Sequence, residues 1–170
     1  MRWYAVYTRF RHERNIGPEL EKMQLEHYLP VVIKERRWKD RRKKIEVPLF
    51  KSYVFVRCDL GGEPGWDLRR EILRIRSVVR ILSSSSGVPT PIPDQEIFNI
   101  RTVLERKMHV DPYEGEFRPG QMIRIKNGPL AGVEGVLQCR KGVHKIMLSV
   151  NLLNQAVAVT LSAEDVERME

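Results

Sequence analysis

The sequence has few of the residues on which disulfide frameworks, metal sites and common catalytic centres depend. Its 170 residues include two cysteines, Cys58 and Cys139, and no CxxC pair, so no disulfide framework is expected. The four histidines have no metal-ligand spacing between them, and we expect neither a metal nor another cofactor. A P-loop, a GxSxG elbow and an HExxH helix are all missing from the sequence, so we do not expect an enzyme.

Long apolar runs are missing as well. No run approaches the ~20 residues needed to cross a bilayer, so no membrane partner is expected. Met1-Arg2 leads directly into a strand-like segment, without the pattern of a signal peptide. The sequence therefore predicts a reduced, soluble, cytoplasmic protein, which we expect to be a monomer.

Positive charge is concentrated in the N-terminal part of the chain. Residues 1–110 hold 23 Lys+Arg against 14 Asp+Glu, a formal charge of +9, whereas residues 111–170 hold 7 against 8, a charge of −1. The densest run, Lys34–Lys44, has eight basic residues in eleven and lies between two strand-like segments. We expect a hairpin tip there, and a nucleic acid or other polyanion as partner of the N-terminal half.

Hydrophobic periodicity predicts an α+β protein. Residues 1–107 contain strand patterns separated by a helix after the first strand, a short helix at Trp66–Leu73 and an amphipathic helix at Asp94–Lys107. These patterns predict a four-stranded antiparallel sheet with helices. Three of its strands are expected at Trp3–Thr8, Tyr28–Ile33 and Val78–Leu82, and the central strand is expected from Ser52 onward within the apolar segment Val47–Val56.

Only strand patterns follow residue 117. Residues 108–117 carry Pro112, Gly115 and three acids without any period, which predicts an interdomain linker. The remaining residues, 118–170, predict a small five-stranded β-barrel, because closure removes the edges of so short a sheet. The predicted division is therefore 1–107, 108–117 and 118–170.

One segment, GQMIRIKNGPLAGVEGVL, combines strands with glycines at fixed places. Gly128-Pro129 forms a turn, and Gly132 and Gly135 precede the next strand. This pattern resembles the KOW motif. Together with RWYAVYT, PLFKSYVFV and PIPDQEI in the same order, it resembles the layout of the NusG family of transcription elongation factors. The resemblance implies an elongation or antitermination factor with a NusG N-terminal domain and a C-terminal KOW barrel.

One position departs from the family pattern. The family commonly has Phe-Pro-Gly-Tyr where this chain has Phe50-Lys51-Ser52-Tyr53. Loss of Pro-Gly is more typical of specialised, RfaH-like paralogues, and we expect this chain to be one of them.

The resemblance also implies functional residues. Tyr7, Phe50, Tyr53 and Phe55 match positions that grip the clamp helices of RNA polymerase, and Leu152 and Leu153 match the contact of the KOW domain with Rho or a small-subunit ribosomal protein. Contacts with the non-template DNA strand or nascent RNA are expected from six basic residues: Arg9, Arg11, His12, Arg14, Arg69 and Arg70.

Other interpretations of these residues stay open. The four aromatic residues could belong to the core, or the sheet could stack bases as RRM domains do. Phe10 could stack on a base or staple the first helix. The alternative function is a KOW-type RNA-binding protein of the ribosome or of RNA processing, which would not need an aromatic N-terminal sheet.

Overall fold

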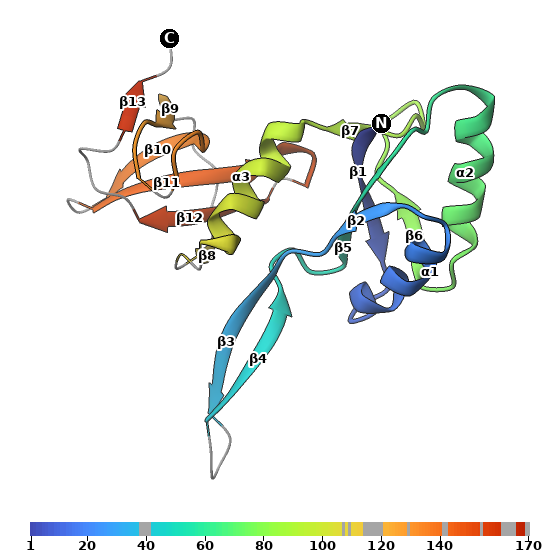
Figure 1. Cartoon of the computed structure of the whole chain (residues 1–170), viewed down its shortest axis with the longest axis horizontal. Coiled ribbons are helices and arrows are strands. Elements are labelled where there is room, and N and C mark those ends of the chain that lie inside the picture. The colour runs from blue at the N-terminus through green and yellow to red at the C-terminus, as the bar shows by residue number, and fades with distance from the viewer. Residues whose placement is uncertain are drawn as a thin grey trace. The chain divides into compact units, whose positions relative to one another are not determined.

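The structure is a computed structural model, and it forms two compact units, Met1–Pro93 and Asp94–Glu170 (Figure 1). It describes residues 1–37, 42–106, 108, 110–113, 121–128, 130–140, 143–153, 155–160 and 166–168. Helices and antiparallel sheets occur together, which confirms the predicted α+β class. No helix among the described residues is both long enough and apolar enough to cross a membrane.

The first unit is built on a five-stranded antiparallel sheet in the order β2-β5-β1-β6, with β7 also pairing with β1. Four strands were predicted, and β7 is the addition: a two-residue strand too short to show any periodicity. The predicted strand at 28–33 is divided at Pro30, so that its first part joins the sheet and the rest leaves it. The bounds are β1 (Arg2–Thr8), β2 (Glu26–Tyr28), β5 (Tyr53–Cys58), β6 (Val78–Ile81) and β7 (Pro91–Ile92).

Helices cover one face of this sheet. They are η1 (Glu13–Ile16), α1 (Gly17–Lys22) and α2 (Gly62–Arg74). Fully buried side chains on the three helices, Ile16, Leu20 and Ile72, pack against Val6 and Val54 of the sheet in one apolar core. Alternate residues of a strand point to opposite faces, so the neighbours of Val6 and Val54 point away from the helices.

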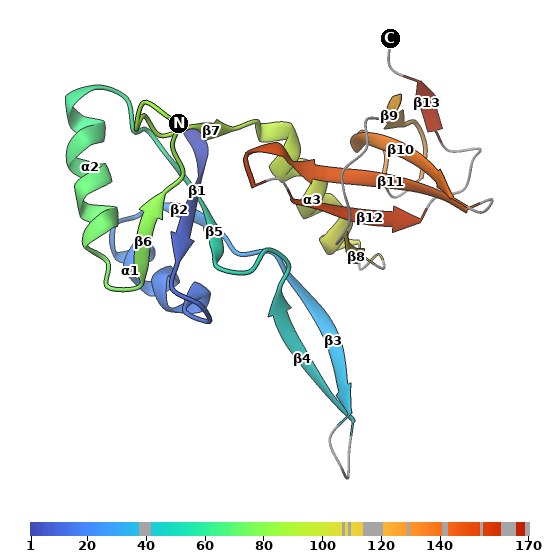
Figure 2. The same ribbon diagram turned by 180° about the vertical axis from the view of Figure 1, so that it is seen from behind.

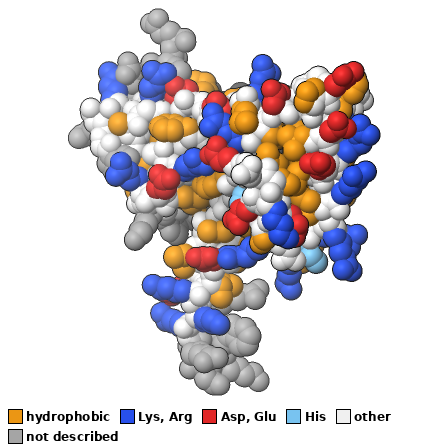
Figure 3. Space-filling model, turned by 45° about the vertical axis from the view of Figure 1, so that its right-hand side comes forward, with side chains coloured by type: hydrophobic (Ala, Val, Ile, Leu, Met, Phe, Trp, Pro, Cys, Tyr) orange, Lys and Arg blue, Asp and Glu red, His pale blue; other side chains and the backbone are white. Residues whose placement is uncertain are grey.

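A long hairpin extends from the sheet of the first unit. Its strands β3 (Val31–Arg37) and β4 (Arg42–Pro48) pair along their whole length, and both views show the hairpin projecting outward (Figures 1 and 2). The side chains of Lys34, Lys43 and Lys44 are exposed on it. Figure 3 shows Lys and Arg side chains, in blue, gathered on this projection. The predicted hairpin is confirmed, but Lys34–Arg37 and Arg42–Lys44 of the basic run lie on its paired strands rather than at a tip, and residues 38–41 lie outside the described residues.

The second unit consists of α3 (Asp94–Glu105) and a six-stranded antiparallel sheet. The sheet has the order β13-β9-β10-β11-β12-β8, and α3 packs beside β11. The strands are β8 (Val110–Tyr113), β9 (Gln121–Ile125), β10 (Glu134–Arg140), β11 (Val143–Val150), β12 (Gln155–Thr160) and β13 (Val166–Arg168), with the one-turn helix η2 (Asn151–Leu153) before β12.

The strand count of this unit exceeds the predicted five because β8 lies inside the predicted linker. Val110 and Pro112 pair with Val159 and Val157 of β12. Pro112 lacks a backbone N–H, and an edge strand tolerates this because one side of its backbone has no partner. The sequence predicted a linker here because Pro112 and Gly115 disfavour a strand, although Val110 and Tyr113 favour one.

The helix α3 groups with the second unit, whereas the sequence placed it in the first domain. The compact units divide after Pro93, and the predicted first domain ends at residue 107. This difference leaves the charge asymmetry intact: residues 1–93 hold 20 Lys+Arg against 11 Asp+Glu, a formal charge of +9.

Candidate functional site

Four predicted aromatic residues come together on the sheet face opposite the helices. Tyr7 pairs directly with Tyr53 across β1 and β5, and Phe55 is two residues further along β5, so all three side chains share one face. The rings of Tyr7 and Tyr53 lie 5.2 Å apart, and those of Phe50 and Phe55 lie 5.9 Å apart at 80°. We call Tyr7, Phe50, Tyr53 and Phe55 the aromatic row.

The aromatic row has a buried part and an accessible part. Phe50 and Phe55 are 1% and 0% exposed, whereas Tyr7 and Tyr53 are half-buried. Two residues that the sequence analysis missed extend the row. The ring of Tyr28 stacks at 6.4 Å on Phe55, and the guanidinium of Arg80 lies 5.4 Å from the centre of the Tyr7 ring. An aromatic surface with a cation at one end therefore follows the sheet.

The turn that leads into β5 forms without the Pro-Gly pair of Phe-Pro-Gly-Tyr. The backbone N–H of Tyr53 donates to the carbonyl of Phe50 at 3.3 Å, and Ser52 has a φ of 64°. A positive φ at the third position defines a type II turn, for which Pro-Gly is the best central pair. Here Lys51-Ser52 adopts the same turn without either residue.

A buried carboxylate stabilises that turn. Glu13 accepts a hydrogen bond from the backbone N–H of Ser52 at 2.8 Å, and the N–H of Thr8 donates to the carbonyl of Ser52 at 2.8 Å. These bonds tie the end of β1 to the start of β5 and offset the conformational cost of a non-glycine residue. The sequence analysis missed Glu13, because nothing local connects it with a turn so much later in the chain.

A second turn of the same kind displays the predicted basic residues. The N–H of His12 donates to the carbonyl of Arg9 at 3.0 Å, and Arg11 has a φ of 62°. Phe10 lies at the outer corner with the guanidinium of Arg11 5.1 Å from its ring centre. We call residues Arg9–His12 the cationic turn, since Arg9, Arg11 and His12 are all exposed on it.

The other predicted basic residues lie on separate elements. Arg14 of η1 forms a 2.8 Å ion pair with Glu46 of β4, and Arg70 of α2 forms a 2.6 Å ion pair with Asp67. Both pairs are exposed, and such pairs contribute little to stability, so either arginine is available to an anionic ligand. Arg69 is half-buried on α2.

The KOW glycines each meet a backbone requirement in the second unit. Gly128 and Gly132 have φ values of 80° and 86°, in the region that glycine adopts without strain. A Cβ on Gly135 would lie 2.6 Å from the carbonyl oxygen of Met147, so β10 passes too close to β11 for any side chain. Pro129 lies outside the described residues.

The predicted partner contact lies beside α3. Leu152 and Leu153 are half-buried in η2, directly after Asn151. Glu96 of α3 accepts hydrogen bonds from the side chain of Asn151 at 2.9 Å and from its backbone N–H at 3.3 Å. Burial raises the pKa of Glu96 above its ordinary value, and the two bonds from Asn151 partly oppose this shift.

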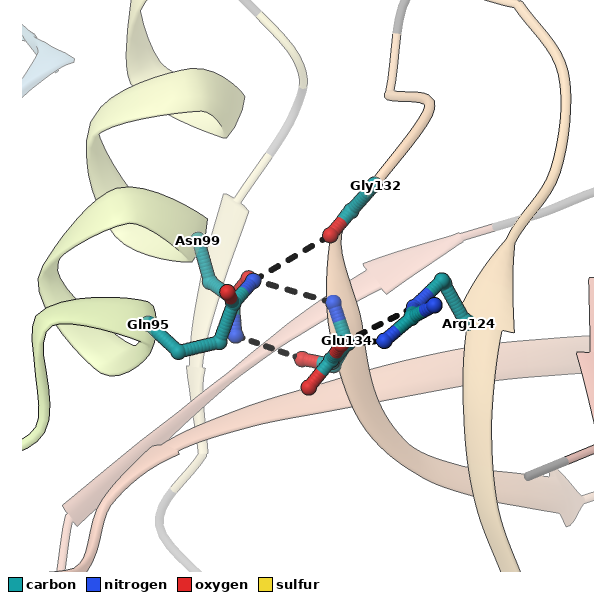
Figure 4. A network of polar contacts seen from close by, with 5 residues as sticks. All are labelled: Gln95, Asn99, Arg124, Gly132 and Glu134. Atoms are coloured by element: carbon teal, nitrogen blue, oxygen red, sulfur yellow. Dashed lines mark hydrogen bonds and ion pairs between the residues drawn. The ribbon is translucent and has the colours of Figure 1, made fainter. Parts of the chain in front are cut away.

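A polar network joins α3 to β10 (Figure 4). The amide of Asn99 donates to the carbonyl of Glu134 at 2.7 Å, and its oxygen accepts from the N–H of Glu134 at 3.1 Å. Gln95 donates both to Asn99 at 2.8 Å and to the carbonyl of Gly132 at 3.2 Å. The pairing of β10 with β11 begins only at Val136, so β11 does not pair with Glu134. The Asn99 side chain bonds to the backbone groups of Glu134 that a neighbouring strand would otherwise pair with.

The remaining candidates for site chemistry are clusters of metal ligands and the thiol of Cys58. No group of three or more potential metal ligands occurs among the described residues. Burial raises the pKa of the Cys58 thiol to about 11, so this thiol stays protonated and unreactive at neutral pH.

Comparison with known proteins identifies the family. A family model described as "Transcription termination factor nusG" matches residues 1–101. The chain belongs to the NusG family. The transcription termination/antitermination protein NusG of Pasteurella multocida (strain Pm70) is 28% identical over 131 residues, covering 75% of this chain and 68% of that protein. NusG of Escherichia coli (strain K12) is 29% identical over 129 residues, covering 75% and 69%.

Membership of the NusG family makes the chain a transcription termination/antitermination factor rather than an enzyme. The family match extends through residue 101, and so past the division of the compact units into α3. Among solved structures, a chain of the MjSpt4:Spt5 complex is 20% identical and covers 99% of this chain and 97% of its own length. The TM-score between the two chains is 0.32.

Proposed function

We propose that this NusG-family factor binds the clamp helices of RNA polymerase through the aromatic row. The observation that carries the proposal is the placement of Tyr7, Tyr53 and Phe55 on the sheet face opposite the helices of the first unit, with Phe50 packed against Phe55. A helix tip can pack against an aromatic surface, since aromatic rings offer a large contact area and lose little conformational entropy on binding.

The chemistry of the row supports a polymerase contact more than a purely structural role. Tyr7 and Tyr53 keep part of their surface accessible and carry hydroxyl groups that can hydrogen-bond to a partner. The guanidinium of Arg80 beside Tyr7 adds a positive charge at the same end of the row. We propose that the tyrosines and Arg80 contact the partner directly and that Phe50 and Phe55 fix the shape of the surface.

The same proposal includes nucleic acid as a ligand of the first unit. Residues 1–93 carry a formal charge of +9, and the cationic turn displays Arg9, Arg11 and His12, none of which forms an ion pair with another described residue. Arginine neutralises phosphates and also hydrogen-bonds to bases. We propose the non-template DNA strand or nascent RNA as the ligand, with Arg14, Arg69 and Arg70 as further contacts.

The second unit is proposed to recruit a further protein through Leu152 and Leu153. Its formal charge is −1, from 10 Lys+Arg against 11 Asp+Glu in residues 94–170, which favours an apolar contact over an electrostatic one. Rho or a small-subunit ribosomal protein is the proposed partner. The Lys51-Ser52 turn supports a specialised, RfaH-like role, since the turn no longer has the family's Pro-Gly pair.

The polymerase contact is tested by titrating the full chain with RNA polymerase. We expect Tyr53→Ala and Tyr7→Ala each to weaken binding, because both side chains are accessible members of the row. Tyr53→Phe is the matched control: it keeps the ring and should retain most of the affinity. The far-UV circular dichroism of every variant must match that of the unmodified chain. Undiminished binding by both alanine variants would contradict the proposal.

A further inference from the structure

Phe10 is the most exposed aromatic side chain that the structure describes. It is 64% exposed, compared with 57% for Trp66 and 47% for Phe98. A hydrophobic staple would bury this ring against the helix that follows, and so much exposure excludes that role. An apolar ring held in water is unfavourable by itself, and such residues often mark a contact with a ligand.

The backbone around Phe10 holds the ring in place. The N–H of Arg9 donates to the carbonyl of Ser77 at 2.9 Å, which fixes the start of the cationic turn to the segment before β6. The ring Nδ1 of His12 donates to the carbonyl of Phe10 at 2.9 Å, and the backbone N–H of His12 closes the turn. Phe10 therefore projects from a turn that is hydrogen-bonded on both sides.

The neighbours of Phe10 are positively charged rather than apolar. Arg11 adopts a left-handed φ of 62° and its guanidinium lies 5.1 Å from the centre of the Phe10 ring. Arg9 and His12, which complete the turn, are exposed and polar as well. A protein partner would usually bury several apolar side chains together, whereas this turn offers one aromatic plane flanked by two arginines.

A single aromatic plane with flanking cations fits one class of ligand well. Each nucleotide of a single strand offers a planar base and a phosphate, so a base can stack on the ring while arginines neutralise the phosphates. We propose that Phe10 stacks on an unpaired base of single-stranded nucleic acid, with Arg9 and Arg11 on the adjoining phosphates. This inference rests on the proposed nucleic-acid contact of the first unit and assigns its base-binding residue.

The test compares strands with and without bases. The full chain is titrated by fluorescence anisotropy with a short oligodeoxythymidine, with an abasic strand of the same length and charge, and with the matching oligouridine. Stacking of one base strengthens binding by roughly 5- to 140-fold, so the unmodified chain should prefer the base-containing strands by about that factor. In Phe10→Ala the preference should fall close to one, while affinity for the abasic strand should stay unchanged.

Three variants make the result specific. Phe98→Ala removes an exposed phenylalanine of α3 and should keep the full preference, and Phe10→Trp should keep or increase it. Arg11→Glu should weaken binding to the base-containing and abasic strands alike and should reduce the salt dependence of both. A greater preference for thymidine than for uridine strands would assign the site to DNA, and the reverse would assign it to RNA.

The failures of the two proposals are distinguishable. If the unmodified chain binds neither kind of strand, the nucleic-acid contact and the stacking site both fail. If it binds base-containing and abasic strands equally, or if Phe10→Ala keeps the full preference, the stacking site fails and the phosphate contact stands. A Phe10→Ala variant that keeps the preference but loses RNA polymerase would show that Phe10 contacts protein, which also overturns the inference.

Discussion

Replacing Asn99 with alanine should loosen α3 from the second sheet. Asn99 is 6% exposed and makes both a donor and an acceptor bond to the backbone of Glu134. The carbonyl of Val133 accepts a hydrogen bond from the backbone N–H of Ile125 in β9. Successive residues of a strand direct their backbone N–H and C=O groups to opposite sides, so those of Glu134 point away from β9. Without Asn99, both backbone groups of Glu134 lose their partner.

The expected cost follows from those two groups. Leaving a buried donor or acceptor unpaired costs about 1–3 kcal/mol. The site is part-buried, so water replaces some of the lost bonding, and alanine favours the helix by about 0.5 kcal/mol over asparagine. We therefore expect Asn99→Ala to lower the free energy of unfolding of the second unit by about 2–3 kcal/mol.

The assay is a urea titration of the full chain, followed by NMR through amide resonances of β10 and β11, together with hydrogen exchange of the Glu134 amide. In Asn99→Ala that amide should exchange faster than in the unmodified chain. Thr102→Ala is the matched control, because it makes a similar change in helix propensity on the same helix outside the network. An unchanged midpoint with unchanged Glu134 protection would refute the account of how α3 is held.

Three further changes test other parts of the structure. Ser52→Gly should raise the free energy of unfolding by about 1 kcal/mol, measured by thermal unfolding, because glycine adopts the φ of 64° without strain; a loss of stability would show that the serine side chain matters more than its backbone. Gly135→Ala should lower stability by more than about 3 kcal/mol in a urea titration, because its Cβ would lie 2.6 Å from the Met147 carbonyl oxygen; a neutral effect would mean that β10 and β11 separate easily. Because the pKa of Glu96 is raised in the folded chain, its contribution to the free energy of unfolding is greatest below the ordinary glutamate pKa of about 4.3 and is lost as pH rises through the raised pKa. Glu96→Gln should remove this decline from a pH series of urea titrations. Identical pH profiles for the variant and the unmodified chain would contradict the shift.

Local sequence patterns predicted the parts of the fold that depend on neighbouring residues. Alternation along Trp3–Thr8 and in the segment from Ser52 predicted the strands β1 and β5, and their register places Tyr7, Tyr53 and Phe55 on one face. The helix predicted at 94–107 corresponds to α3, and the basic run corresponds to the β3–β4 hairpin.

The remaining features depend on partners that are distant in the sequence. Asn99 is a polar residue between apolar neighbours on a helix, and nothing near it indicates that its partner is the backbone of Glu134. Glu13 and Ser52 present the same difficulty. The short strand β7 pairs with the part of β1 that β6 does not reach, and β8 pairs with the outer edge of β12. The sequence of a short strand carries no sign of such a partner.

The central claim is that the aromatic row binds RNA polymerase, and photocrosslinking tests it most directly. A photoreactive phenylalanine analogue is placed at Tyr53 of the full chain, and at Val88, an exposed loop residue, as control. After irradiation with RNA polymerase, mass spectrometry identifies the crosslinked peptides. The account predicts crosslinks from position 53 to the clamp helices and none to them from position 88. Crosslinks from position 53 to any other part of the polymerase, or equal crosslinks from both positions, would contradict it.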